Sequence, residues 1–324
     1  MAAALSPKSK FLVLGRAGMD LYADPPGTEV ENATGFSTAL GGSSGNIAAG
    51  LARHGLTTGL LSCVSQDAVG RFVRNELERY GIDARHVRVL EGESRTSLAV
   101  TETRIENTQN TLYRNNASDL LMSEEQVLGV DFENYDALIV TGTALAGNPS
   151  RSATLRAMEH ARNKGATVVL DLDYRPYSWV SSHEAAETYR AAIEASDIVV
   201  GNDYEFAVVA NGTHDDGRRL AAELGQGDTV VVYKMGEKGS VVFSRDGSFE
   251  TGIFRVEAIK PMGAGDAFMA SLMAGLATGK TLRQAVLAGS AAAAMVVSRI
   301  GCAPAMPTPA ELDEFLNNNT APQT

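Results

Sequence analysis

The chain is poor in the residues that build disulfide frameworks and metal centres. Among its 324 residues only two are cysteine, Cys63 and Cys302, and they lie far apart in apolar surroundings. We therefore expect two buried, reduced thiols rather than a disulfide. The 5 histidines are scattered without the spacing of metal ligands, so the sequence predicts no zinc site.

Long hydrophobic runs are also missing. No apolar stretch of the sequence is long enough to cross a bilayer. The segment 1–10 is too short and too polar to act as a secretory signal. We therefore expect a cytoplasmic protein that has no membrane partner.

Basic residues are outnumbered by acidic ones. The chain has 28 Lys and Arg against 39 Asp and Glu, a formal net charge of −11, and its basic residues form no cluster. Because nucleic-acid backbones are bound by basic surfaces, this balance argues against a nucleic-acid partner. An acidic protein that handles an anionic ligand must concentrate positive potential locally. Main-chain amides, a bound metal ion and a few Arg or Lys side chains can do this.

What the sequence does contain is a regular alternation of two kinds of segment. Short β-rich runs, typical of buried parallel strands, cover residues 11–15, 60–64, 137–141, 167–171, 198–201 and 229–233. Segments with apolar residues at helical spacing lie between them, at 45–54, 69–80, 151–164, 184–195 and 216–224. The alternation predicts a single α/β domain over residues 1–324. Its doubly wound, mainly parallel sheet would be flanked by helices, with ligands at the carboxyl ends of the strands.

Two regions break this alternation. Residues 21–40 and 87–113 are extended in pattern, and neither contains a good amphipathic helix. We interpret them as a small β-sheet that covers the ligand site as a lid. An exposed sheet of this kind is also a candidate interface for a homodimer.

The most informative motif is a glycine-rich turn, Gly263-Ala264-Gly265-Asp266, that runs into an apolar helical stretch. Its glycines allow a tight turn with consecutive free N–H groups, and the helix adds the positive end of its dipole. An anion could bind there beside the carboxylate of Asp266. Phosphoryl transfer to a hydroxyl needs this combination of anion donors and a base. Taken alone, the motif is also typical of an ordinary turn with an Asp cap.

Two motifs near the start of the chain suit a ligand with several hydroxyl groups. The loop Gly41-Gly42-Ser43-Ser44-Gly45-Asn46 lets the backbone approach a ligand closely, and Asn46 offers both a donor and an acceptor. Asp20 follows the first predicted strand, where a carboxylate can accept two hydrogen bonds from neighbouring hydroxyls. A capped turn and a surface Asp are the simpler interpretations.

Two further motifs suit a nucleotide and its metal ion. Asn202 and Glu205 follow a predicted strand and lie on one face of a helical turn, where their oxygens suit hydrated Mg²⁺. The glycine-rich hairpin from Lys234 to Gly239 could lie against a ribose or a triphosphate. N-capping by Asn202 and a plain hairpin turn would give the same patterns.

These motifs, in this order, resemble the ribokinase-like (PfkB) family of carbohydrate kinases over nearly the whole chain. The specific signatures are Gly-Ala-Gly-Asp-Ala-Phe at 263–268 and Gly-Gly-Ser-Ser-Gly-Asn at 41–46. The resemblance implies a ribokinase-like fold with ATP and Mg²⁺ as cofactors. It implies that Asp266 is the general base and that the amides of Gly263, Ala264 and Gly265 form the anion hole.

The resemblance also implies ligand-binding roles for the earlier motifs. The residues that would hold the substrate are Asp20, Gly41, Gly42 and Asn46. Those that would hold the nucleotide are Asn202, Glu205, Lys234, Gly236 and Gly239, with Glu205 binding Mg²⁺ through water. One departure concerns the family's monovalent-cation site. Pro261-Met262 stands where many members have an Asp-Thr-type pair before the glycine, which puts that site in doubt for this chain.

Arginines near the expected site bear on the substrate. Tyr113 and Arg114 end the predicted lid, and Arg175 follows a core strand in the block Asp-Leu-Asp-Tyr-Arg-Pro at 171–176. Two guanidinium groups there could bind a carboxylate, because a guanidinium matches its two oxygens. Surface ion pairing is the alternative. Together with Gly-Arg-Ala-Gly-Met-Asp-Leu-Tyr at 15–22, these segments are similar to those of kinases that act on 5-dehydro-2-deoxygluconate in inositol catabolism.

Other functions remain open on the sequence. Kinases of 2-keto-3-deoxygluconate also have the Tyr-Arg pair, and kinases of fructose or ribose come next. From another class, a sugar- or nucleotide-sensing module would share the fold without catalysis, but retention of Asp266 and of the glycine pair argues against it. A dehydrogenase is disfavoured because no Gly-x-Gly-x-x-Gly turn follows the first strand.

Overall fold

A nine-stranded sheet forms the centre of the structure, a computed structural model that describes residues 5–320. The strand order is β13-β12-β11-β10-β9-β8-β1-β4-β5. All neighbours from β11 to β5 are parallel, and β12 and β13 are added antiparallel at one edge. The strands are β1 (Lys10–Leu14), β4 (Thr57–Ser65), β5 (Asp83–Leu90), β8 (Ala137–Thr141), β9 (Thr167–Asp171), β10 (Ile198–Asn202), β11 (Val230–Lys234), β12 (Ser240–Ser244) and β13 (Gly247–Thr251).

The central strands are apolar on both faces. In β1, the side chains of Phe11 and Val13 belong to one core, and those of Leu12 and Leu14 belong to another. This follows from strand geometry, in which successive side chains point to opposite faces. All four side chains are fully buried. Such a strand requires a helical layer on each side of the sheet, as parallel sheets generally do.

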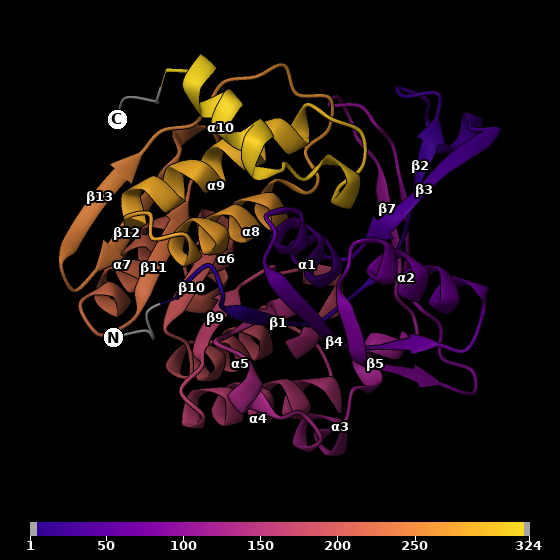
Figure 1. Ribbon diagram of the computed structural model, residues 1–324, viewed down its shortest axis with the longest axis horizontal. Helices are drawn as coiled ribbons and strands as arrows, with labels where there is room; N and C mark the ends of the chain where they lie inside the picture. Colours follow the sequence, from indigo (N-terminus) through magenta and orange to yellow (C-terminus); the bar gives the residue numbers. More distant parts are fainter. Residues whose placement is uncertain (1–4, 321–324) are drawn as a thin grey trace.

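Two helical layers provide this cover. The core of Phe11 and Val13 is closed by α1 (Ser43–Arg53), α2 (Ala68–Arg79), α8 (Ala264–Ala277) and α9 (Leu282–Val297), with α10 (Pro309–Asn318) against α9. The opposite core is closed by α3 (Glu124–Leu128), α4 (Ser150–Asn163), α5 (Ser182–Glu194), α6 (Asp203–Ala210) and α7 (His214–Gly225). Figure 1 shows α8 and α9 on one side of the sheet and α4 and α5 on the other. Within the described chain, no helix has the length and hydropathy needed to span a bilayer.

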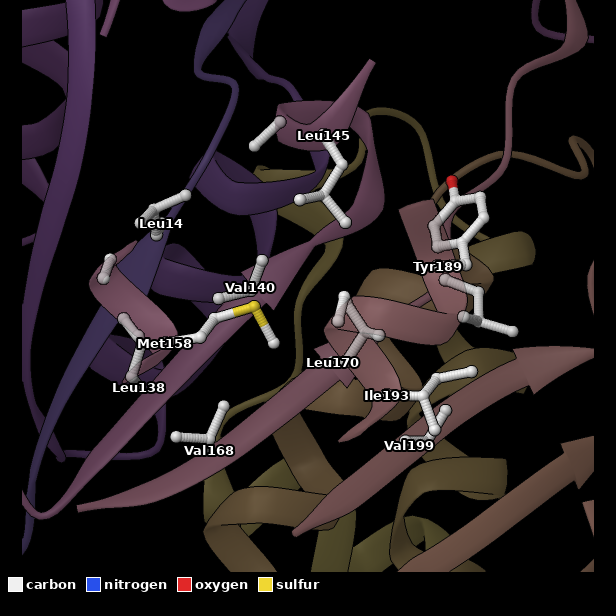
Figure 2. Close-up of a cluster of buried hydrophobic side chains, with 14 of the residues drawn as sticks. Leu14, Leu138, Val140, Leu145, Met158, Val168, Leu170, Tyr189, Ile193 and Val199 are labelled. Carbon is white, nitrogen blue, oxygen red and sulfur yellow. The ribbon is translucent and has the colours of Figure 1, made fainter. Parts of the chain in front are cut away.

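In the core that contains Leu12 and Leu14, helices α4 and α5 pack on the sheet through residues at helical spacing. In Figure 2, Val140 of β8 and Leu170 of β9 lie beside Met158 of α4, while Tyr189 and Ile193 of α5 cover the next part of the sheet. Tyr189 and Ile193 are four residues apart and therefore lie on the same face of their helix. The predicted doubly wound α/β architecture is what the structure shows.

A smaller, four-stranded sheet has the order β3-β2-β6-β7 and consists of β2 (Gly18–Asp24), β3 (Gly35–Gly41), β6 (Leu98–Thr101) and β7 (Asn110–Tyr113). Figure 1 shows β2 and β3 reaching outward from the body of the molecule. Strand β3 changes from exposed residues at 36–38 to buried ones at 39–41, so its inner end lies against the body. The sheet is thereby tied to the loop that begins α1.

One predicted boundary of the lid is wrong. Residues 87–90 belong to β5, which pairs with β4 at the edge of the large sheet, for example Val87 with Ser62. The smaller sheet instead begins at Gly18 and takes only the later part of the range 87–113. An edge strand has few buried positions, and in β5 only Val87 is buried. Its sequence pattern therefore looks like that of a half-exposed lid strand.

The seven parallel strands of the large sheet have their carboxyl ends at the same edge. From β1 the chain runs outward to β4 and β5, returns to β8 on the other side of β1, and continues to β9, β10 and β11. In open α/β sheets, ligands bind at such a switch point, at the carboxyl ends of the strands. The polar residues that follow these strands are therefore the first candidates for a site.

Candidate active site

Helix α8 begins at a glycine in the left-handed conformation. Gly263, with φ of 84°, is the N-cap, and a Cβ atom there would lie 2.9 Å from Sγ of Cys302. The amide of Ala267 bonds to the carbonyl of Gly263 at 3.0 Å and closes the first turn. The amides of Ala264 and Gly265 precede this first intrahelical bond, so they are free for other acceptors. Together with the helix dipole, they make the head of α8 suited to an anion.

The carboxylate of Asp266 is held by a residue of α1. The side-chain amide of Asn46 donates a hydrogen bond of 2.7 Å to Oδ2 of Asp266. One turn further along, small residues allow the two helices to approach closely, because a Cβ atom on Gly50 would lie 2.5 Å from Cβ of Ala270. Residues four apart share a helix face, so the glycine contact and the hydrogen bond lie on the same seam. Asn46 and Asp266, distant in sequence, therefore meet in one site.

The environment of Asp266 changes its proton affinity. Burial, and to a smaller extent the negative charge of Asp173, raise the pKa of the Asp266 carboxyl, which has a net value of about 7. The hydrogen bond from Asn46 and the charges of Arg175 and Arg16 act in the opposite direction. A carboxylate whose pKa lies near neutrality is a suitable proton acceptor at physiological pH.

Asp20 and the glycine pair form a second part of the site. Asp20 lies in β2 and accepts a hydrogen bond of 3.0 Å from the hydroxyl of Tyr22; burial raises its pKa. A Cβ atom on Gly41 would lie 1.9 Å from Oδ1 of Asp20, and one on Gly42 would lie 2.5 Å from the carbonyl oxygen of Arg16. Gly42 also has φ of 86°. Larger side chains at the glycine pair would therefore displace Asp20 or the backbone beside it.

Asn202 and Glu205 form the capping box of α6. The amide of Glu205 donates to Oδ1 of Asn202 at 2.8 Å, and the amide of Asn202 donates to Oε2 of Glu205 at 2.7 Å. The other carboxylate oxygen, Oε1, accepts from the amide of Tyr174 at 3.1 Å. Burial raises the pKa of Glu205, and the nearby charge of Lys234 opposes this. Because both oxygens already accept main-chain bonds, Glu205 fits a metal ion that keeps its water shell rather than one bound directly.

In the described part of the chain, no three His, Cys, Asp or Glu side chains are grouped so that they could hold a metal ion.

Lys234 lies at the end of β11, opposite Asn202 of β10. Its ammonium reaches the head of α8, since a Cβ atom on Gly265 would lie 3.6 Å from Nζ of Lys234. The two glycines of the following turn have left-handed backbone, with φ of 56° at Gly236 and 86° at Gly239. The strand end thus places one cation beside the free amides of α8.

Arg175 is joined to the site through Asp173. Its guanidinium lies 2.6 Å from Oδ1 of Asp173, whose Oδ2 accepts a hydrogen bond of 2.5 Å from the hydroxyl of Ser43. Asp173 has φ of 36°, a conformation that non-glycine residues rarely adopt. The strand end of β9 is therefore connected directly to the start of α1.

Arg114 and Tyr113 differ in exposure. The guanidinium of Arg114 pairs with buried Asp119 and donates a hydrogen bond of 2.8 Å to the carbonyl of Thr143, just after β8. Its Nη1 is buried and has no hydrogen-bond partner within residues 5–320. Tyr113 is 58% exposed. Arg114 thus reaches a strand end at the switch point and keeps one free donor.

Comparison with known proteins identifies the family. Residues 8–309 match the description of a pfkB family carbohydrate kinase. The chain belongs to this family. The 5-dehydro-2-deoxygluconokinase of Photobacterium profundum is 44% identical over 310 residues, which cover 94% of both chains. The enzyme of the same name from Bacillus subtilis is 36% identical over 309 residues, covering 94% of this kinase and 95% of the relative.

Solved structures show the same fold. A fructokinase from Vibrio cholerae, in a form with bound fructose, ADP and potassium ion, has a TM-score of 0.85 at 24% identity and covers 96% of this kinase and 99% of that chain. An aminoimidazole riboside kinase from Salmonella enterica, complexed with its riboside and an ATP analogue, has a TM-score of 0.79 at 23% identity, covering 95% and 100%. The predicted ribokinase-like fold and the predicted carbohydrate-kinase family are confirmed.

Several charged residues of this kinase were not singled out as site residues by sequence reasoning. Arg16 donates a hydrogen bond of 3.1 Å to the hydroxyl of Ser97, and its buried Nε has no acceptor in the part of the chain that the structure describes. Asp171, at the end of β9, is buried, and burial raises its pKa. Arg16 lies in the motif at 15–22 and Asp171 in the motif at 171–176, and membership of these motifs could have identified both as site residues. Lys260 stands in no motif and gave no signal.

The shifted pKa of Asp266 makes the stability of this kinase depend on pH. The folded carboxyl keeps its proton up to about pH 7, whereas the ordinary value is 3.8. The native state therefore binds more protons between these pH values, and the stability contributed by this group falls as pH rises through that window. Asp266→Asn removes the effect. Its free energy of unfolding relative to wild type should rise from pH 5 to pH 7, by at most about 1.4 kcal/mol per pH unit.

Urea unfolding at a series of pH values measures this difference. The control is Asp246→Asn, at an exposed position in the turn between β12 and β13. Stability profiles of wild type and Asp266→Asn that remain parallel from pH 5 to pH 8 would contradict the raised pKa.

Proposed function

We propose that this kinase transfers the γ-phosphoryl group of ATP to the terminal hydroxyl of 5-dehydro-2-deoxy-D-gluconate, a sugar acid of inositol catabolism, in the cytoplasm. Relatives named 5-dehydro-2-deoxygluconokinase, at 36% and 44% identity over nearly the whole chain, support this substrate. The structural observation that carries the chemistry is Asp266. Its carboxyl has a pKa of about 7, is oriented by Asn46, and lies in the first turn of α8 beside free amides.

The proposed reaction uses these groups in order. Asp266 accepts the proton of the terminal hydroxyl as its oxygen attacks the γ-phosphorus, and the bond to the β,γ-bridging oxygen of ATP breaks in line. Asn46 holds the carboxylate toward the acceptor. The amides of Gly263, Ala264 and Gly265 bind the phosphoryl oxygens as negative charge develops. Lys234, whose ammonium lies beside Gly265, contributes positive charge at the same place.

Nucleotide binding is assigned to the ends of β10 and β11. Asn202 and Glu205 would hold hydrated Mg²⁺, which neutralises phosphate charge when it is bound with ATP. Support comes from the capping box, which fixes both side chains at a strand end near Lys234. Gly236 and Gly239 let the turn after β11 lie close to the nucleotide, since neither carries a side chain.

Substrate recognition is assigned to both halves of the site. Asp20 would accept hydrogen bonds from sugar hydroxyls. Arg16 and Arg114 each have a buried guanidinium nitrogen without a protein acceptor among residues 5–320, and a carboxylate is the anion that such donors match best. Arg175, close enough to influence Asp266, completes the basic side of the site.

The smaller sheet is assigned the role of a lid. Asp20 in β2 and Gly41 in β3 link it directly to the substrate site, so its movement would exclude water during transfer. Its outer face exposes Phe36 and Tyr113. We infer that this face joins two copies of the kinase, and a monomeric mass in sedimentation velocity at micromolar concentration would contradict the dimer.

Asp266→Asn tests the proposed chemistry. Because general bases contribute about 10²–10⁴-fold, kcat with 5-dehydro-2-deoxygluconate should fall by that factor. Binding of an ATP analogue should be retained. A coupled ADP-release assay gives kcat, calorimetry gives binding, and Asp246→Asn is the control. A folded Asp266→Asn variant with wild-type kcat would refute the base. Wild type that binds sugar and nucleotide but releases no ADP would indicate a sensing module instead.

Arginine variants test recognition of the carboxylate. We expect Arg16→Lys and Arg114→Lys to raise KM for the sugar acid by about 10- to 100-fold, since each loses a charged hydrogen bond. Lysine is chosen at 114 because an uncharged side chain would leave buried Asp119 without its partner. KM for fructose, which lacks the carboxylate, should change little.

The same assay with 2-keto-3-deoxygluconate as acceptor compares two sugar acids. Arg156→Lys, in an exposed ion pair of α4, is the matched control. Equal losses with fructose and with the sugar acids would mean that these arginines do not read a carboxylate.

A further inference from the structure

A buried lysine lies directly behind the proposed anion hole. Lys260, in the irregular segment between β13 and α8, has a relative exposure of 0% and is among the largest fully buried side chains of the kinase. Lysine is almost never fully buried unless its charge is compensated. Within residues 5–320, no carboxylate lies within ion-pair distance of its ammonium. Burial of this unpaired charge costs free energy, and a function of Lys260 would explain its position.

The ammonium of Lys260 binds the turn that leads into α8. Its Nζ donates a hydrogen bond of 2.6 Å to the carbonyl oxygen of Met262. In a trans peptide the N–H group points opposite to the C=O group of the same bond. The carbonyl of Met262 is turned toward Lys260, so the amide of Gly263 is turned away from it. The lysine thus sets the direction of the first amide in the proposed anion hole.

The backbone around Lys260 is fixed from the other side. The amides of Ile259 and Lys260 both bond to the carbonyl of Val297 at the end of α9, at 2.8 and 3.2 Å. Gly263 follows with φ of 84°, and the neighbouring thiol of Cys302 leaves no room for a side chain there. The turn is therefore held by α9 at one end, by α8 at the other, and by the ammonium in between.

The charge of Lys260 is directed toward the site. Asp20, Asp266 and Cys302 are the titratable groups that interact with it. Burial raises the pKa of the Cys302 thiol to about 12, so this neighbour is neutral and cannot act as a counter-ion. The two carboxylates belong to the proposed substrate and base positions. The positive charge of Lys260 therefore acts on Asp20 and Asp266, and no structural ion pair in the described part of the chain neutralises it.

We propose that the Lys260 ammonium is a built-in monovalent cation of this kinase, which orients the amides at the head of α8 and supplies a fixed positive charge behind the transferred phosphoryl group. This inference rests on the proposed function. Lys260 is a positioning residue, because it contacts the turn and not the substrate. A fructokinase of the same fold was solved with a bound potassium ion, and in this kinase the chain itself would provide the cation.

Lys260→Met tests this role, because methionine is an unbranched, adaptable side chain that fills most of the same buried space without the charge. Removal of one group that stabilises transition-state charge costs about 10²–10³-fold, and we expect a loss of kcat in that range with little change in KM for the sugar acid. Wild type should have the same kcat in potassium and in tetramethylammonium buffers. Lys280→Met, at an exposed position after α8, is the control.

Lys260→Ala provides a second measurement, since it removes the ammonium together with the side chain that filled its place. Added ammonium or potassium ions should restore part of its kcat, and should not stimulate wild type. A folded Lys260→Met variant with wild-type kcat, or a wild type that needs potassium for activity, would overturn the proposal.

Hydrogen exchange separates this proposal from the proposed function. Amides of residues 263–266 should exchange faster in Lys260→Met than in wild type, whether or not any sugar is phosphorylated. Unchanged exchange would overturn the positioning role. Absence of turnover by wild type, with faster exchange in the variant, would instead refute the sugar-acid kinase assignment alone.

Discussion

The site depends on how closely α1 approaches α8. A Cβ atom on Gly50 would lie 2.5 Å from Cβ of Ala270, so any larger residue at position 50 would separate the helices. One turn away, the same approach brings the amide of Asn46 to 2.7 Å from Asp266. The hydrogen bond between a residue of the first helix and one near the C-terminal end is thus a consequence of packing. It orients the first-turn carboxylate that we propose as the base.

Electrostatics explain how an acidic protein handles anionic ligands. The net charge is −11, and the site itself contains several carboxyl groups, two of which, Asp171 and Asp266, have pKa values raised to about 7. Positive charge is concentrated against them by Lys234 at the end of β11 and by Lys260 behind the α8 turn. The free amides at the head of α8 add to this potential without any charged side chain. A basic surface is therefore unnecessary.

Much of the architecture follows from short-range patterns. The strands at 137–141 and 167–171 have the bounds predicted from the sequence, because uninterrupted β-rich runs end there at a glycine or a polar residue. The sequence wrongly places part of the edge strand at 83–90 in the lid. A strand that is buried on one side has the same sequence pattern at the edge of the large sheet as in the smaller sheet.

The site was predictable as a set of motifs and not as a set of contacts. The sequence marks Asn46 and Asp266 separately, since each stands beside glycines before a helix, but 220 positions separate them and only the fold joins them. The partner of Arg114, buried Asp119, depends on the path of the chain after β7. Lys260 lies in a segment without periodicity. Its importance comes from its complete burial, and the sequence around a single lysine does not indicate whether that lysine is buried.

The most direct test of the central claim is a structure of the kinase with 5-dehydro-2-deoxygluconate and a non-hydrolysable ATP analogue. We expect a carboxylate oxygen of Asp266 within about 3.2 Å of the terminal hydroxyl, with the amides at the head of α8 directed at the γ-phosphate. A terminal hydroxyl that lies beyond hydrogen-bond reach of Asp266, with the γ-phosphate away from α8, would contradict the assignment of this turn as the centre of phosphoryl transfer.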